Sequence, residues 1–571
     1  MRWASRGSRR DLRRRSGIVC ERWPMTQLDC CRQLLAEISA EVAATLPPGR
    51  AQALLALLRA GDTMTLADDP VQATRPGWNL ALRLCLERQN DEDGTFPADH
   101  AMLDARAARF LADCDQLALA DLALAQCASG HLQLQQRAPR TFVAWATSRR
   151  LSTEQRERAD FDWWSAHLTR QVAPRLAALR AERDRMLALL GGEGAPISAS
   201  GEYVASDPTV ERYYRQLGQA HVARFTCQHS YPADAAIGGA TFRRYTDILA
   251  LLIGWLHHER DRRATDSDHT PTLLDEQAMI AALANALDAD PTAIGRALQP
   301  FILDRDNAAY HSALSGYAAP PLIRLDEDRV VWSVRGLLGE PLLFLARELR
   351  HRHTQEYHNS AHLREGVFRQ DLYRLFSDRR FVLSAGRVEL KRSGEARTDL
   401  DALVFDRKTG ILGIFELKAQ DLFARSVEER QRQRDNFFHA NRQVSAILEW
   451  VQRHGPDDLL NRFDERAAKR FHVQKVHVFV LGRYLAHFAG GPEPDRRAAW
   501  GSWPQVLQIV EDGLFDPDNR NPLGALFARL RDAALPSAPA NADSQTIAVG
   551  DLHLRIFPSF ADMRSEEDRP A

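Results

Sequence analysis

The residues best suited to chemistry lie in two short runs separated by a polar turn. The first run contains Asp399 and Asp401, and the second ends in Glu416 and Lys418. Opposed carboxylates bind a hard, oxygen-preferring cation such as Mg²⁺, which can activate a water and stabilise the departing oxygen of a phosphodiester. A lysine beside them can position the attacking water or neutralise charge in the transition state.

Lysine is rare in this chain, and its rarity sets Lys418 apart. Of 75 lysines and arginines only five are lysines, and the first 390 residues contain none. Lysine is a compact charge whose pKa can be lowered, whereas the arginine guanidinium stays protonated. A lysine retained at the end of a hydrophobic strand therefore indicates a site that orients or activates water.

The two runs are predicted to pair as a β-hairpin, because a short polar segment with a glycine separates them. A four-residue loop after Asp406 places Asp401 opposite Glu416 and Asp399 opposite Lys418. Side chains alternate between the two faces of a strand, so these four charged groups share one face. That face continues as Leu403, Phe405, Leu412 and Ile414, and the other face carries Leu400, Ala402, Val404, Ile411, Phe415 and Leu417. The alternative is an edge hairpin with solvated charges.

Asp401, followed by Glu416-Leu-Lys418, resembles the motif of the PD-(D/E)xK nucleases, which have the restriction-endonuclease-like fold. The resemblance covers about residues 360–485, and the proline of the family name is replaced by Leu400. It implies an α/β core in the order αβββαβ and a hydrolysis of nucleic-acid phosphodiester bonds that depends on Mg²⁺ or Mn²⁺.

The resemblance also implies roles for individual residues. Asp401 and Glu416 would hold the metal, with Asp399 as a less favoured ligand, and Lys418 would position the water. Family members often carry a glutamate in the first helix that reaches the metal, and Glu365 is the matching residue.

The segments around the hairpin fit that core. Helical spacing over 362–376, a strand at 381–385, a helix at 427–451 and a strand at 473–481 flank the hairpin in the expected order. The apolar stripe of the later helix turns polar at Arg430 and Gln433, which would lie near the charged end of the hairpin and orient phosphate or water. A frayed, solvated first turn is the alternative.

Composition bounds the class of protein. The length of 571 residues predicts three or four domains, and no uncharged apolar run is long enough to span a membrane. Seven cysteines without a CxxC pair indicate reduced thiols in a cytoplasmic protein. The net charge of −1 lacks the basic excess usual in a nucleic-acid enzyme, although arginines can cluster locally.

The predicted fold class is multidomain, with a large, mostly α-helical N-terminal region, an α/β restriction-endonuclease-like core and a small C-terminal extension. The predicted units are residues 1–24, 25–345, 346–490 and 491–571, with a linker near 536–543. The first unit is either a disordered basic arm or a misassigned start before Met25. Helices are expected almost throughout 26–308, the longest at 153–190, followed by a strand pair at 323–332, a helix at 340–350 and a strand or hairpin at 546–557. We expect His257, His258 and Glu259 to form a solvated helix end.

These patterns favour a metal-dependent nuclease acting on DNA rather than RNA, in a defence, restriction or repair setting. A catalytically inactive nucleic-acid-binding or scaffold protein with a degenerate core is the main alternative. An all-helical interaction protein with an incidental hairpin is a third reading, and it predicts no mixed sheet over 360–485. A homodimer or a protein partner would bind through the helical region.

Overall fold

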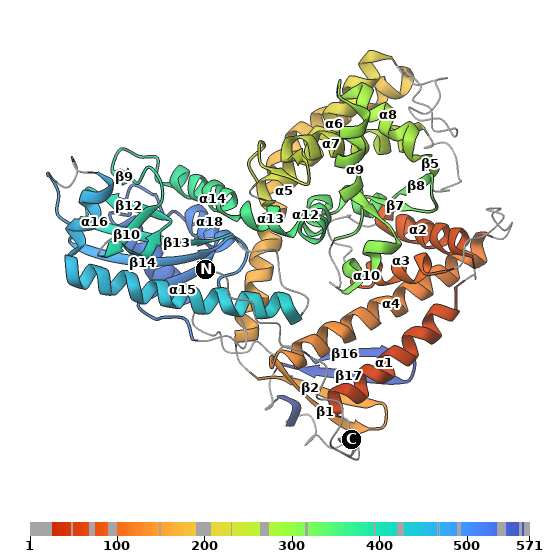
Figure 1. Cartoon of the computed structure of the whole chain (residues 1–571), viewed down its shortest axis with the longest axis horizontal. Helices are drawn as coiled ribbons and strands as arrows, with labels where there is room; N and C mark the ends of the chain where they lie inside the picture. The colour runs from red at the N-terminus through yellow and green to blue at the C-terminus, as the bar shows by residue number, and fades with distance from the viewer. Residues whose placement is uncertain are drawn as a thin grey trace, which may run out of the picture.

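The computed structural model describes the chain in a series of segments. They are residues 26–46, 49–67, 75–88, 100–147, 150–189, 207–229, 231–262, 273–313, 318–392, 395–419, 427–464, 466, 469–487, 493–533, 544–558 and 562–564. The predicted arm at 1–24 and the linker near 536–543 lie outside the described residues. A helical N-terminal region and a later α/β region are both present, as predicted (Figure 1).

The first part combines four helices with a sheet built from both ends of the chain. Its elements are α1 (Gln27–Ala44), α2 (Arg50–Ala67), α3 (Trp78–Leu86), α4 (His100–Ala128), β1 (Leu132–Ala138), β2 (Thr141–Ala146), β16 (Gln545–Val549) and β17 (Leu552–Phe557). The sheet order is β1-β2-β17-β16, and β17 pairs in parallel with β2. The C-terminal hairpin is therefore confirmed, but the prediction of helices almost throughout 26–308 was wrong at β1 and β2.

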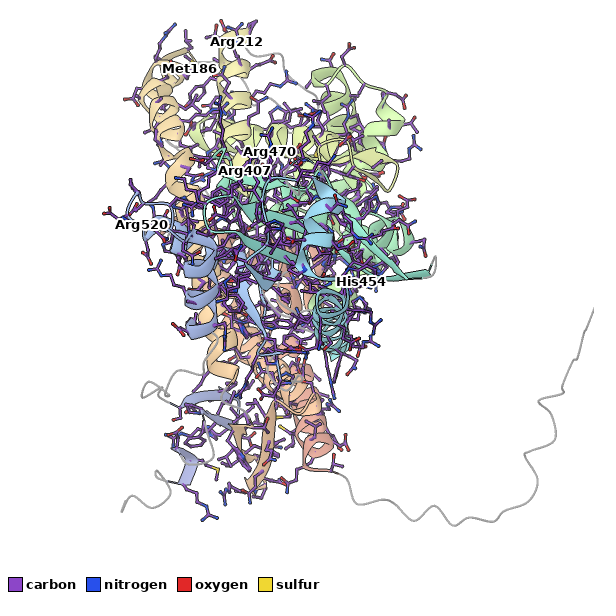
Figure 2. All side chains as sticks on the ribbon, turned by 90° about the vertical axis from the view of Figure 1, so that its left-hand side faces the viewer. Met186, Arg212, Arg407, His454, Arg470 and Arg520 are labelled. Atoms are coloured by element: carbon purple, nitrogen blue, oxygen red, sulfur yellow. The ribbon has the colours of Figure 1, made fainter. Side chains whose placement is uncertain are left out.

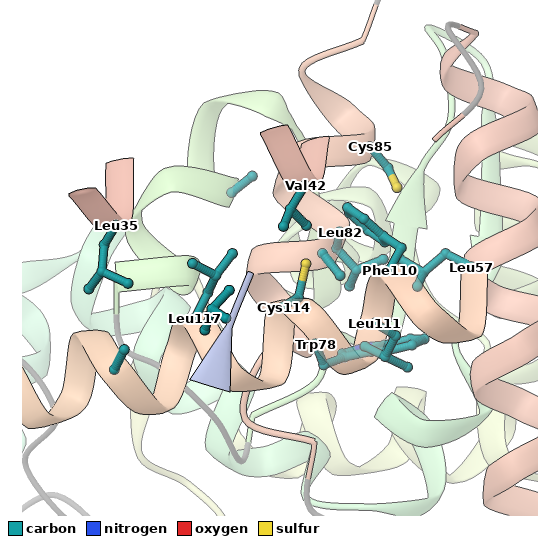
Figure 3. Packing of buried hydrophobic residues seen from close by; sticks show 14 of the residues in the cluster. Leu35, Val42, Leu57, Trp78, Leu82, Cys85, Phe110, Leu111, Cys114 and Leu117 are labelled. Carbon is teal, nitrogen blue, oxygen red and sulfur yellow. The ribbon is translucent and has the colours of Figure 1, made fainter. Parts of the chain in front are cut away.

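The helices of this part pack around small and aromatic side chains. Trp78, Cys85, Phe110 and Cys114 lie together in this core (Figure 3), each at most 2% exposed. Buried cysteine behaves as a small apolar residue. The five cysteines for which the structure describes the side chain are free thiols.

The second part is a helical group with a small sheet. Its elements are α5 (Arg150–Leu189), α6 (Pro208–His229), β3 (Ala236–Ile237), β4 (Ala240–Thr241), α7 (Phe242–Arg262), β5 (Leu273–Asp275), α8 (Glu276–Ala286), α9 (Pro291–Leu298), the 3₁₀ turn η2 (Gln299–Phe301), β6 (Ile302–Leu303), α10 (Arg305–Ala313), β7 (Leu322–Arg324), β8 (Arg329–Trp332), α11 (Val334–Leu338), α12 (Pro341–Arg352) and α13 (Thr354–Asn359). The strand order is β5-β8-β7-β6. The strand pair predicted at 323–332 and the helix after it are confirmed as β7, β8 and α12.

Helices α6 and α7 approach so closely that the expected solvated end of α7 is buried. The ring of His258 lies against Tyr214 of α6 at a centroid distance of 4.7 Å, and His258 and Glu259 are 2% and 7% exposed. Glycines at the crossing allow this approach, since a Cβ on Gly218 would lie 1.8 Å from the carbonyl oxygen of Ala250. The prediction of a solvated helix end was wrong, because the glycine contact at this crossing is not visible in local sequence.

The third part is a five-stranded mixed sheet between helices. Its elements are α14 (Ala361–Leu375), β9 (Phe381–Leu383), β10 (Val388–Arg392), β11 (Glu395–Leu400), β12 (Ala402–Asp406), β13 (Ile411–Lys418), α15 (Val427–His454), α16 (Pro456–Phe463), β14 (Lys475–Gly482), β15 (Ala498–Ser502), α18 (Trp503–Glu511) and α19 (Pro522–Ala533). The order is β15-β14-β13-β12-β9, with β13, β14 and β15 parallel to one another and β12 antiparallel to both neighbours. This mixed sheet excludes the all-helical reading.

Apolar side chains cover both faces of the sheet and are buried under the helices that pack on them. Phe415 and Leu417 pack on the side of α14, α18 and α19, whereas Leu412 and Ile414 pack on the side of α15. The long helix α5 joins the first of these layers, because Phe161, Trp164 and Leu168 belong to the same core cluster. Helix α5 thus extends from the helical part into the core of the α/β part. No helix among the described residues is long and apolar enough to cross a membrane.

Candidate active site

The hairpin has the predicted register. Ala402 pairs with Phe415 and Asp406 with Ile411, so Asp401 and Glu416 come next at the open end of the ladder. Figure 2 labels Arg407 in the turn of this hairpin, and Asp401 and Glu416 lie beyond the opposite end of its ladder.

The backbone departs from the prediction at Asp401, which forms a bend between β11 and β12. Asp399 lies in β11 opposite Glu389 of β10, not opposite Lys418, and its carboxylate pairs with Arg387. The bend also interrupts the side-chain alternation, so Leu400 packs in the core layer of α15 rather than on the other face.

Asp401 is held at the end of β13 by a backbone contact. Its Oδ2 accepts a hydrogen bond from the amide of Leu417 at 2.8 Å, and the residue is 8% exposed. Burial raises the pKa of Asp401, although Lys418 and this amide oppose the shift. The bend thus turns the carboxylate toward the strand that carries Glu416.

Glu416 is almost fully buried, and only one of its two carboxylate oxygens has a hydrogen-bond partner among the described residues. Its exposure is 2%, and burial raises the pKa of the carboxyl to about 8 despite the nearby ammonium of Lys418. Oε1 accepts a hydrogen bond from Nζ of Lys418, whereas Oε2 has no hydrogen-bond partner among the described residues. A buried, unpaired carboxylate oxygen is costly, and the cost falls when a cation binds it.

Lys418 is a fixed donor in this arrangement. Its Nζ donates to Glu416 and, at 3.0 Å, to Oε1 of Gln443 in α15. Burial by itself lowers the pKa of Lys418, but Glu416 and Asp401 outweigh it and the net shift is upward. The lowered pKa that lysine rarity suggested is therefore not found here, and the group orients its neighbours as an ammonium ion.

The remaining predicted residues lie on the two neighbouring helices. Burial and the charge of Asp401 raise the pKa of Glu365 in α14, so this carboxyl is near enough to Asp401 to be influenced by its charge. Gln433 of α15 lines a cavity of about 20 Å³ together with Lys418, which is room for about one water. Arg430 lies in the first turn of α15, and its side chain is outside the described residues.

Three polar residues at the site were not predicted. Gln443 contacts Lys418, His487 lines the same cavity, and Glu157 of α5 is hydrogen-bonded to His487. The alternation of strands points to neither His487 nor Glu157, because their contact spans 330 residues of sequence. Gln443 lies in the predicted helix 427–451, next to its apolar stripe. A helical wheel of this segment could therefore have indicated Gln443 as a candidate site residue.

The donor set fits a hard divalent ion. Among the described residues, no group of three or more histidine, cysteine, aspartate or glutamate side chains is gathered for a metal. Mg²⁺ does not require such a group, since proteins commonly hold it through one or two carboxylates together with waters and substrate phosphates. Asp401 and Glu416 supply two such carboxylates, and the unpaired Oε2 of Glu416 is the oxygen that a cation would satisfy.

Comparisons of this chain with protein-family models, with curated proteins and with solved structures found no significant match.

Proposed function

We propose that this chain is a nuclease that hydrolyses phosphodiester bonds with Mg²⁺ or Mn²⁺. One observation carries the proposal: Asp401, Glu416 and Lys418 converge at one end of β13, where Glu416 keeps a buried oxygen without a partner. A core without catalysis has no reason to retain this arrangement, because burying these charges costs stability.

The order of elements adds support. Apart from the inserted β10, β11 and α16, the elements α14, β9, β12, β13, α15 and β14 come along the chain as α, β, β, β, α and β, the order that the PD-(D/E)xK resemblance implies. Asp401 directly precedes β12 and Glu416 lies on β13, which are the second and third strands of this order. The β10–β11 hairpin and β15 are additions to that core.

Each residue then has a defined task. Asp401 and Glu416 would hold the ion, which when bound supplies positive charge next to the phosphoryl oxygens. Lys418 donates to the water or to a phosphate oxygen, and Gln443 keeps its Nζ in place. Glu365 adds a third carboxylate at the edge of the site. DNA is the proposed substrate, and a defence, restriction or repair role is the proposed setting.

The test is cleavage of double-stranded DNA, single-stranded DNA and RNA by the purified full chain, with Mg²⁺ or Mn²⁺ against EDTA. We expect metal-dependent cleavage that falls by about 10²-fold or more in Lys418→Ala, the order seen when one charge-stabilising donor is removed. Asp401→Ala should abolish it. Lys475→Ala is the matched control, because Lys475 is an exposed lysine at the far end of the neighbouring strand β14.

Two outcomes would contradict the proposal. Cleavage that survives in Asp401→Ala would place the active site elsewhere. A folded protein that binds nucleic acid but cleaves no substrate with either metal would favour the catalytically inactive binding protein.

A further inference from the structure

The exposed face of α15 carries an aromatic side chain between two arginines. Phe438 is 42% exposed, and it is one of two large apolar side chains that are exposed among the described residues. Arg434 comes one turn before it and Arg442 one turn after it, and both arginines are exposed. Residues four positions apart lie on the same side of a helix, so these three side chains form one row, the α15 row. The row is about 12 Å long, since each residue adds about 1.5 Å to the helix.

The α15 row is positively charged and accessible to a ligand. The guanidinium of Arg434 lies over the ring of Phe438, 5.7 Å from its centroid. Neither Arg434 nor Arg442 has an ion-pair partner among the residues that the structure describes. Asp435, the acid between the two arginines, accepts a hydrogen bond from Gln431 at 3.0 Å. An exposed ring beside two uncompensated guanidinium groups suits a ligand with flat faces and negative charges.

The α15 row lies beside the candidate active site. Gln443, which follows Arg442 in the chain, accepts a hydrogen bond from Nζ of Lys418 at 3.0 Å. Phe438 is five residues from Gln443, about 7.5 Å along the helix axis. His439, the next residue, has a pKa that partial burial lowers, and the charges of Lys418 and then Arg442 add to this shift. A strand bound to the row therefore passes close to Lys418.

Resting on the proposed nuclease function, we propose that the α15 row binds an unpaired strand of the nucleic-acid substrate. A base stacks on Phe438, and Arg434 and Arg442 pair with phosphates of the same strand. The row is long enough for two or more nucleotides, because phosphates of one strand are about 3.4 Å apart along a duplex axis. Every base has a flat face, so stacking tolerates any sequence, whereas neighbouring base pairs cover that face inside a duplex. The substrate is therefore single-stranded where it crosses α15.

The first experiment measures binding of the wild-type full chain to fluorescent oligonucleotides by anisotropy. EDTA is present, so that no metal-dependent cleavage occurs. The ligands are oligo(dT), oligo(U) and a blunt DNA duplex, each of about 20 residues per strand, a length that exceeds most single-strand sites. We expect at least one single strand to bind about tenfold more tightly than the duplex, and the better ligand identifies DNA or RNA. No binding of either single strand, or equal binding of the duplex, would overturn the proposal.

Variants of the α15 row separate stacking from charge. Phe438→Ala and Phe438→Leu should each weaken single-strand binding by about tenfold, the effect of losing one stacked base, and Phe438→Trp should retain it. Arg442→Ala should reduce the slope of log affinity against log salt by about 0.7, because one phosphate contact is lost. Leu189→Ala and Arg453→Ala are the matched controls, since both side chains are exposed and lie outside the row.

Cleavage separates this proposal from the nuclease proposal. On a single-stranded substrate, Phe438→Ala should raise KM by about tenfold, whereas Lys418→Ala should act on kcat. If Phe438→Ala and Arg442→Ala bind single strands as wild type does, the row has no role, although cleavage by wild type would still support the nuclease. If wild type cleaves nothing, yet both variants lose single-strand binding, the row is upheld and only the nuclease proposal fails.

Discussion

Acidification should destabilise the crossing of α6 and α7 through its buried histidines. Burial lowers the pKa of His257 to about 3 and that of His258 to about 4, from an ordinary value of 6.5. Both ring nitrogens of His258 and Nε2 of His257 lack a hydrogen-bond partner among the described residues. The folded state therefore keeps both imidazoles neutral at a pH where the unfolded chain protonates them.

The sign and size follow from proton linkage. Below about pH 6.5 the unfolded state binds more protons than the folded state, so stability falls as the pH drops toward the folded pKa values. At about pH 5, a histidine that stays neutral in the folded state lowers the free energy of unfolding by about RT ln(1 + 10^1.5). This amounts to about 2 kcal/mol for each histidine. The figure hardly depends on the folded pKa, provided that this lies well below 5. Burial also lowers the pKa of His221 in α6 to about 3, so the three histidines together cost about 6 kcal/mol, a large part of the roughly 5–15 kcal/mol that stabilises a typical protein.

Amide hydrogen exchange of peptides from α6 and α7, corrected for the intrinsic rate at each pH, measures this effect. Between about pH 7.5 and 5 the free energy of opening should fall by about 6 kcal/mol in wild type, and by about 2 kcal/mol less in His257→Phe, a difference of about 30-fold in rate. Phenylalanine preserves a ring against His221, which stacks on His257 at a centroid distance of 4.9 Å. Replacing the exposed His472 by phenylalanine should leave the pH dependence of wild type. Unchanged protection at pH 5, or the same loss in His257→Phe, would refute the reasoning.

Two further variants test the packing. Gly218→Ala should destabilise the protein in urea unfolding by about 2 kcal/mol or more, because the new Cβ would meet the backbone of Ala250 at 1.8 Å; Gly366→Ala, whose Cβ would meet only the tip of a side chain at 4.0 Å, is the control and should be neutral or slightly stabilising. Asp406→Ala should lower the free energy of unfolding by about 3–5 kcal/mol near neutral pH. The half-buried Arg380 donates two hydrogen bonds to this fully buried carboxylate and would lose them. Hydrogen bonds, chiefly from Arg380, hold the pKa of Asp406 below its ordinary value, so the variant should lose less stability than wild type as the pH falls below about 4. If Gly218→Ala or Asp406→Ala unfolds at the same urea concentration as wild type, the contact behind that prediction is contradicted.

The sequence by itself determined the register of the hairpin and the position of the charges at one end. Alternation of side chains is a property of neighbouring residues, and a four-residue turn after Asp406 leaves one consistent pairing. The helix before the hairpin and the one after it were predicted for the same reason, because a 3.6-residue apolar stripe is local.

Tertiary structure decided what those charges face. The bend at Asp401 removed Asp399 from the ladder, and its pairing with Arg387 follows from the β10–β11 hairpin rather than from the motif. Glu157 and His487 meet only because α5 packs across the sheet, and β2 meets β17 only because the two ends of the chain fold together. Contacts between residues hundreds of positions apart depend on the packing of whole elements, and local periodicity carries no information about them.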